Sequence, residues 1–203
     1  MRSTRAAEAV AELESLAHKP ARLRMYIINQ TRLKAANDAV ICELDQLGVY
    51  DAWMQGVETH LVTFGVAYGW QYYGGTGHIN IPRVSLSRLS DWLAGPSMPL
   101  RAVLRHEFGH ALADMHRGLF RSRRFSDVFG AAHDSDCEWE YDPEHHITEY
   151  AASDPSEDFA EVFRFYLRHK GRLPRRMATA PIRRKWRFID ELRKAISNGD
   201  RRW

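Results

Sequence analysis

Apolar residues recur every three or four positions in several stretches of the chain, which is the spacing of one face of an α-helix. Thr31 can cap the first strongly periodic stretch and Gly48 can end it, while Asp154-Pro155 is typical of a helix start and Gly171 of a helix end. These patterns predict helices over residues 31–47, 99–116, 154–170 and 181–196, and a more polar, alanine- and glutamate-rich helix over residues 5–17. The predicted core side chains on these helices include Leu33, Ala36, Val40, Leu44, Val103, Leu104, Phe108, Leu112, Trp186, Ile189, Leu192 and Ile196.

A different pattern fills residues 59–82, the longest stretch without Asp, Glu, Lys or Arg. It predicts two strands, over residues 60–70 and 78–86, joined by a glycine-rich turn at residues 73–77. Pro82 cannot donate a ladder hydrogen bond, so the second strand is expected at the edge of the sheet.

Three further segments lack the periodicity of a helix with one apolar face. Residues 89–93 suit a short turn or helix, and the basic, aromatic residues 117–132 are expected to be irregular. From Asp134 to Glu144 an acid occupies every second position, a period that suits a strand or an extended loop with one acidic face.

The composition is that of an ordinary globular domain. Of 203 residues, 44% are hydrophobic and 27% charged, which excludes wholesale disorder and fibrous repeats. Two cysteines exclude a disulfide scaffold, and a net charge of +3 is too small to favour a nucleic-acid partner. The first residues lack the apolar core of a secretory signal, and no stretch suits a membrane span. We therefore expect a cytoplasmic protein, with non-classical secretion as an effector left open.

One string carries candidate chemistry: Leu104-Arg-His-Glu-Phe-Gly-His-Ala-Leu-Ala-Asp114. In a helix, His106 and His110 lie one turn apart on the same face, so both imidazoles can bind one metal ion. Glu107 lies about 100° round the helix, near enough to reach a water at the metal without being a ligand. This is the H-E-x-x-H arrangement of zinc proteases.

A zinc site needs a third protein ligand, and two residues compete for that role. His116 has the spacing of the longer motif H-E-x-x-H-x-x-G-x-x-H, but Ala113 stands where that motif has its turning glycine. Glu157 follows Asp154 by three residues, so it can be an ordinary capping-box acid. Glu161, one turn further on, favours Glu157 as the ligand, because a second acid there can hold a ligand histidine by its free ring N–H.

At these residues the chain resembles the gluzincin metallopeptidases, in which the third zinc ligand is a Glu on a downstream helix. The resemblance is closest to the branch that contains the catalytic domain of anthrax lethal factor, the Mlc titration factor A peptidases and bacterial zinc-binding metallopeptidases. It is carried by residues 104–114 and by Tyr150-Ala-Ala-Ser-Asp-Pro-Ser-Glu-Asp-Phe-Ala-Glu-Val-Phe-Arg164, and it covers residues 78–170. Residues 1–57 resemble no family that we can name.

The resemblance implies zinc as the cofactor and a role for each matching residue. Glu107 would be the general base and Tyr150 the residue that stabilises the oxyanion. The implied zinc ligands are His106, His110 and Glu157. Glu161 matches the acid that supports a ligand histidine, and Asp114 is either a second such acid or simply a solvent-facing one.

The implied fold is α+β and zincin-like. A small mixed sheet, with residues 78–86 as its edge strand, would pack on the H-E-x-x-H helix and pair with the substrate backbone. Residues 1–57 would form an N-terminal helical segment and residues 58–203 the metallopeptidase domain. In that domain the N-terminal lobe would end near residue 117, and a mainly helical C-terminal lobe would follow.

The expected function is therefore hydrolysis of peptide bonds in a polypeptide substrate, as an endopeptidase. A catalytically weak, zinc-holding regulatory domain stays open, and it would use a fourth protein ligand such as His133, His145 or His146. The same chemistry in a delivered toxin or effector is a third possibility. The acidic residues 134–144 could favour a basic substrate segment or only aid solubility. Cys137 could approach the metal as a thiolate or be a plain buried thiol.

Overall fold

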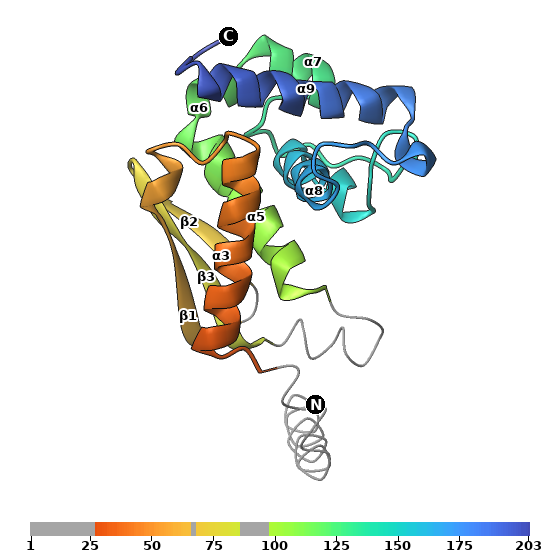
Figure 1. The fold of residues 1–203 in the computed structure, drawn as a ribbon. Coiled ribbons are helices and arrows are strands. Elements are labelled where there is room, and N and C mark those ends of the chain that lie inside the picture. The colour runs from red at the N-terminus through yellow and green to blue at the C-terminus, as the bar shows by residue number, and fades with distance from the viewer. Residues whose placement is uncertain (1–26, 66–67, 86–97) are drawn as a thin grey trace, which may run out of the picture.

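The computed structural model describes residues 27–65, 68–85 and 98–203. It has an α+β fold with a small mixed sheet, as predicted (Figure 1). The predicted helix at residues 5–17 and the short element at residues 89–93 lie outside the described residues. In chain order the elements are α3 (Gln30–Gln46), the 3₁₀ turn η1 (Met54–Gly56), β1 (Val57–Gly65), β2 (Gly69–Tyr73), β3 (Thr76–Ser85), α5 (Leu100–Met115), α6 (Arg117–Phe120), α7 (Arg123–Phe129), η2 (Tyr150–Ala152), α8 (Pro155–Arg168), η3 (Arg175–Met177) and α9 (Ala180–Ser197).

The sheet differs from the prediction in two ways. The single strand predicted over residues 60–70 is wrong, because the chain leaves β1 at Gly65 and begins β2 at Gly69. The described strands have the order β1-β3-β2, so β3 is central and β2 is an edge strand. β3 runs parallel to β1 and antiparallel to β2. The expectation that residues 78–86 form the edge strand is therefore wrong.

Pro82 fits a central strand because the two neighbours of β3 have different lengths. β2 pairs with β3 only from Thr76 to Asn80, whereas β1 pairs with it as far as Ser85. At Pro82, β3 therefore has only one described strand beside it, and a residue without an N–H can be tolerated there.

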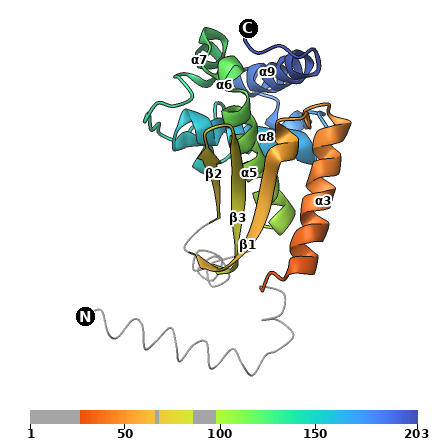
Figure 2. The same cartoon turned by 90° about the vertical axis from the view of Figure 1, so that its left-hand side faces the viewer.

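Helices α3 and α5 lie side by side on one face of the sheet (Figure 2). The predicted stripe of α3 is confirmed, since Leu33, Ala36, Val40 and Leu44 are buried in one core with α5 and α9. The N-cap of α3 is Asn29 and not Thr31: the Asn29 side chain accepts a hydrogen bond from the N–H of Arg32. Across the two helices, Arg105 forms a two-pronged ion pair with Glu43 at 2.7 Å.

The C-terminal lobe consists of α6 to α9. Helices α6, α7 and α9 lie beyond the end of the sheet, and α8 packs beside α5 (Figure 1). The expectation that residues 117–132 are irregular is wrong, because this segment forms α6 and α7. Local capping explains α7: the Ser122 side chain accepts from the N–H of Phe125, and Gly130 ends the helix with a φ of 87°. Helices α5, α8 and α9 match the predicted helices to within a few residues.

The C-terminal end of the chain, from Ser197 onward, contacts both lobes. The Arg201 guanidinium lies 3.7 Å from the centre of the Trp53 ring, and the Trp203 indole N–H donates to the carbonyl of Leu119. The Ser197 hydroxyl donates to the carbonyl of Gly48, at the end of α3. Within the described ranges, no helix combines the length and the apolar character that a membrane crossing needs.

An aromatic cluster forms the core of the C-terminal lobe. Its members meet mostly edge to face, and they are Phe120, Phe125, Phe129, Phe159 and Phe188. His133 lies edge-on against Phe120 and Phe125, at ring distances of 5.4 and 5.2 Å. Burial in this apolar environment, with a smaller contribution from nearby His110, lowers the pKa of His133 to about 4.

The neutral His133 makes the stability of the protein depend on pH. Its folded pKa lies below the unfolded value near 6.5, so unfolding takes up a proton below pH 6.5. The stabilisation is complete above pH 6.5, and we expect on the order of 2 kcal/mol of it to be lost between pH 6.5 and 4. Urea unfolding in EDTA at a series of pH values measures this loss.

A pair of substitutions isolates the contribution of His133. The loss of stability between pH 6.5 and 4 should be smaller in His133→Gln than in the wild type. It should be unchanged in His145→Gln, because His145 is exposed. An equal pH dependence in the wild type and in His133→Gln would show that His133 does not titrate in this way.

Candidate metal centre

The candidate metal centre lies where α5 and α8 pack closely against each other. A Cβ atom on Gly109 of α5 would lie 3.1 Å from the Cα atom of Ala160 on α8, closer than most such contacts. The two candidate histidines lie three residues before and one residue after Gly109. Glu157 and Glu161 lie at the same offsets from Ala160. The close contact therefore turns two histidines on one helix towards two carboxylates on the other.

Glu157 lies in the first turn of α8. The predicted N-cap is confirmed, since the Asp154 side chain accepts from the N–H groups of Ser156 and Glu157. Pro155 occupies the first helical position, also as predicted. The Glu157 carboxylate itself faces the histidines of α5.

Three side-chain atoms form a nearly equilateral triangle. The distances are 3.0 Å from His106 Nε2 to Glu157 Oε2, 3.3 Å from His110 Nε2 to the same oxygen, and 3.1 Å between the two Nε2 atoms. Two ligands of a tetrahedral zinc ion, each about 2.0 to 2.1 Å from it, are separated by about 3.3 Å. His106, His110 and Glu157 could thus hold a metal ion.

Glu161 lies at the other ring nitrogen of His106. Its Oε1 is 3.0 Å from His106 Nδ1, and the residue is only 1% exposed. Glu161 also accepts hydrogen bonds from the Thr148 hydroxyl and the buried Arg164 guanidinium. With Nδ1 bound to this carboxylate, His106 presents Nε2 towards Glu157.

The buried acids make this centre attractive to positive charge. Burial alone would lower the pKa of His106, but its hydrogen bonds with Glu157 and Glu161 raise it to about 9. Burial would raise the pKa of Glu161, and its bonds to His106 and Arg164 hold it at about 2. The pKa of Glu157 is also held below its ordinary value by both histidines, against the effect of burial. The carboxylates are therefore ionised at neutral pH, as metal ligation requires.

Glu107 lies beside the triangle and is held by strand β2. Its Oε2 accepts a hydrogen bond of 2.9 Å from the backbone N–H of Trp70. Burial raises the pKa of Glu107 above its ordinary value, against the opposing effect of the two histidines. This carboxylate can thus exchange a proton more readily near neutral pH than an exposed Glu.

Asp114 supports the strand that holds Glu107. Its Oδ2 accepts from the Trp70 indole N–H at 2.8 Å, and its Oδ1 accepts from Arg117. Within the described residues no hydrogen bond joins Asp114 to His110. Trp70 in turn occupies the space next to Gly77, where a Cβ atom would overlap the indole ring.

Tyr150 lies at the mouth of the centre, in the 3₁₀ turn η2. Its ring centre is 5.8 Å from that of His106, and the residue is 55% exposed. Partial burial and the Glu157 carboxylate raise the pKa of Tyr150 above its ordinary value, so its hydroxyl keeps its proton.

The other candidate ligands lie elsewhere. His116 is 3% exposed, stacks on Trp53 and faces Asp51, so it does not join the triangle. Among the described residues, the group of His106, His110 and Glu157 is the only set of three or more His, Cys, Asp or Glu side chains placed to share one ion. That group includes none of the fourth-ligand candidates, His133, His145 and His146. Cys137 is exposed, so the expectation of a buried thiol is wrong.

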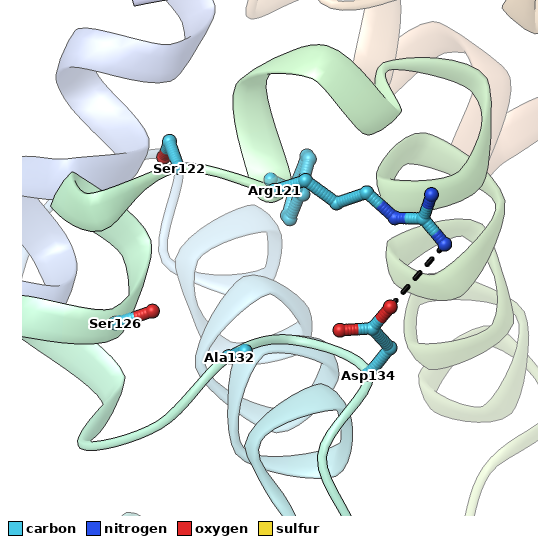
Figure 3. A pocket seen from close by; sticks show the side chains of 6 residues that line it. Arg121, Ser122, Ser126, Ala132 and Asp134 are labelled. Carbon is cyan, nitrogen blue, oxygen red and sulfur yellow. Dashed lines mark ion pairs between the residues drawn. The ribbon is translucent and has the colours of Figure 1, made fainter.

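Open space lies beside the C-terminal half of α5. A cavity of about 220 Å³ is lined by Asp114, His133 and Ser156, the neighbour of Glu157 in sequence. A second cavity, of about 450 Å³, shares the residues Phe120, Arg121 and Asp134 with it. Figure 3 shows the Arg121 and Asp134 side chains pointing towards each other. They form an ion pair of 3.2 Å. The pair therefore lies between the two cavities.

Three residues that hold the acids of this centre in place were not identified from the sequence: Trp70, Thr148 and Arg164. Arg164 follows Glu161 by three residues on the same helix, and this spacing was a usable signal for an ion pair. Trp70 and Thr148 come from a strand and a loop, and nothing in the local sequence links them to the metal centre.

The chain matches no family model, no curated protein and no solved structure. The assignment of the metal centre therefore depends on the geometry of this chain alone.

The metal content of purified variants tests this ligand set. We expect the wild type to hold about one ion per chain and Glu157→Ala to lose it, because two imidazoles alone bind zinc weakly. His116→Ala should keep the ion, since His116 faces Asp51. Glu149→Ala, which removes an exposed Glu, is the matched control.

Elemental analysis of the folded fraction gives the metal content. Retention of the metal by Glu157→Ala together with its loss from His116→Ala would contradict the assignment.

Proposed function

We propose that the protein is a zinc-dependent metallopeptidase with a zincin-like fold, which hydrolyses peptide bonds in a polypeptide substrate. The observation that carries the proposal is the Nε2, Nε2, Oε2 triangle with a separate carboxylate, Glu107, directly beside it. Two imidazoles and one carboxylate suit zinc among the divalent metals. The bound metal would polarise the scissile carbonyl and make the attacking water more acidic.

Glu107 is the proposed general base. Its carboxylate takes a proton from the attacking water and later gives it to the leaving amine, so no net proton is gained or lost. The bond from the Trp70 N–H occupies Oε2 and leaves Oε1 for this exchange. The raised pKa of Glu107 brings the carboxylate closer to the pH at which it must both accept and donate.

Tyr150 is the proposed hydrogen-bond donor to the carbonyl oxygen as negative charge develops on it. Two observations support this role. The hydroxyl stays protonated because the pKa of Tyr150 is raised, and the side chain is exposed enough to reach a bound substrate.

A structural zinc site is the alternative, and its usual feature is a fourth protein ligand. The described residues offer three ligands in one group. Three protein ligands with the fourth position left open are typical of catalytic zinc. The presence of three protein ligands in the group therefore favours a hydrolytic role over a purely structural one.

The variant Glu107→Gln separates metal binding from hydrolysis. The amide oxygen of Gln can still accept from Trp70, so the local structure should persist, but an amide cannot take a proton from water. We expect full metal content and a loss of at least about 10²-fold in the hydrolysis of a casein substrate. Glu149→Gln is the control at an exposed acid. Unchanged turnover in Glu107→Gln would remove this residue from the mechanism.

The variant Tyr150→Phe tests the oxyanion donor. Loss of one such donor costs about 10²-fold or more in kcat, and the zinc content should stay the same because the hydroxyl is not a ligand. Tyr141→Phe, at another exposed tyrosine, should have no effect. Steady-state kinetics would overturn the role of Tyr150 if its kcat equalled that of the wild type.

A further inference from the structure

A third cavity, of about 370 Å³, lies between the acidic loop and the helices of the C-terminal lobe. It involves the end of α7, the start of α8, the first half of α9 and the loop before η2. Its lining residues are Asp127, Val128, Phe129, Gly130, Trp139, Glu140, Asp142, His145, His146, Asp158, Arg184 and Lys185. None of these residues is among the metal ligands or the catalytic groups proposed above.

Asp158 is a buried carboxylate in the wall of this cavity that has only one of its oxygens satisfied. The residue is 1% exposed, and its Oδ2 accepts a hydrogen bond of 2.5 Å from the Lys185 ammonium. Its Oδ1 is buried and has no hydrogen-bond partner among the described residues. A buried acceptor without a donor is costly, so this oxygen points to a donor that the described residues do not supply.

The Lys185 ammonium is not free to act as the missing hydrogen-bond donor to Asp158 Oδ1. Its ammonium already donates to Asp158 Oδ2 and to the backbone carbonyl of His145, and the residue is 4% exposed. The lysine therefore joins α9 to the loop, and its hydrogen bonds go to atoms other than Asp158 Oδ1.

The other residues that line this cavity favour a ligand that carries a positive charge on an apolar stem. Three further acids, Asp127, Glu140 and Asp142, are exposed at the rim, against one exposed cation, Arg184. The Trp139 indole stacks on His146 with ring centres 5.9 Å apart. An indole face attracts ammonium and guanidinium groups, and it also covers the methylene groups that carry them.

We propose that this cavity binds an organic cation, an ammonium or guanidinium group on a short aliphatic stem, whose N–H donates to Asp158 Oδ1. The stem lies along Trp139 and the acidic rim attracts the charge. Two sources share this chemistry: a free aliphatic amine, and a Lys or Arg side chain of a peptide. The proposal does not depend on peptidase activity.

Isothermal titration calorimetry on the full chain tests the proposal with defined probes. Agmatine represents the free amine, N-acetyl-Ala-Arg-Ala-amide represents the peptide side chain, and n-butylurea is the uncharged analogue. We expect saturable binding of one cation per chain with a dissociation constant of about 0.1 to 1 mM, and no saturation with n-butylurea. Saturation by agmatine points to a free amine, and saturation by the peptide alone points to a side chain.

Two substitutions on the same loop provide a matched pair. Glu140 lines the cavity and Glu138 does not, although both are exposed acids two residues apart. Glu140→Gln should weaken binding about 3-fold, and Glu138→Gln should leave it unchanged. Asp158→Asn should weaken it at least 10-fold, because it replaces a charge-assisted hydrogen bond with a neutral one.

Asp158→Asn leaves Lys185 buried without its carboxylate and can fail to fold, so Trp139→Leu is the second variant at the binding surface. It should weaken binding about 5-fold through loss of the cation–π contact. The absence of saturable binding to the wild type up to about 10 mM would overturn the proposal. Equal weakening by Glu138→Gln and Glu140→Gln would also overturn it, because it would show attraction to the whole acidic loop.

Discussion

The contact between Gly109 and Ala160 is the constraint on which the metal centre depends. A glycine inside a helix costs about 1 kcal/mol relative to alanine. Here the lack of a side chain lets α5 approach α8 until a Cβ atom would be only 3.1 Å from the Ala160 backbone. The four functional side chains lie at equal offsets from this contact, so its distance sets the separation of imidazoles and carboxylates. If the helices lay further apart, each ligand pair would separate with them.

Such a concentration of buried charge needs internal compensation. Each buried ion loses hydration, and an unpaired one would be strongly destabilising. Two acids of this centre have such partners: Glu161 has His106, Thr148 and Arg164, while Glu107 has the Trp70 N–H. The partners come from β2, the loop before η2, and α8, so both lobes contribute to the same network. The fold thus holds the candidate ligands in position by itself, so that binding of an ion there would require little reorganisation.

The sequence predicted the parts of this arrangement that depend on helical spacing. His106 and His110 share a helix face by their separation alone, and the Asp154 cap with Glu157 and Glu161 one turn apart indicated the second helix. Strand order could not be obtained in this way, because pairing between distant segments determines it and Pro82 gave a misleading signal. Helices α6 and α7 were missed because they are short and their aromatic residues pack with distant phenylalanines. For α3, the predicted N-cap, Thr31, lies two residues after the observed one, Asn29, because both are good capping residues.

The two halves of the ligand set belong to helices that contact each other directly, yet the chain takes more than forty residues to pass from His110 to Glu157. Between Asp134 and Asp142 that connection runs without helix or strand and is largely exposed. The helix contact, and not the connecting loop, therefore keeps the ligands in register. A backbone cut in this loop would leave a nicked protein whose two fragments stay associated and still share the triangle of ligand atoms. The geometry of the candidate ligands and the covalent continuity of the chain are thus separable properties of this protein.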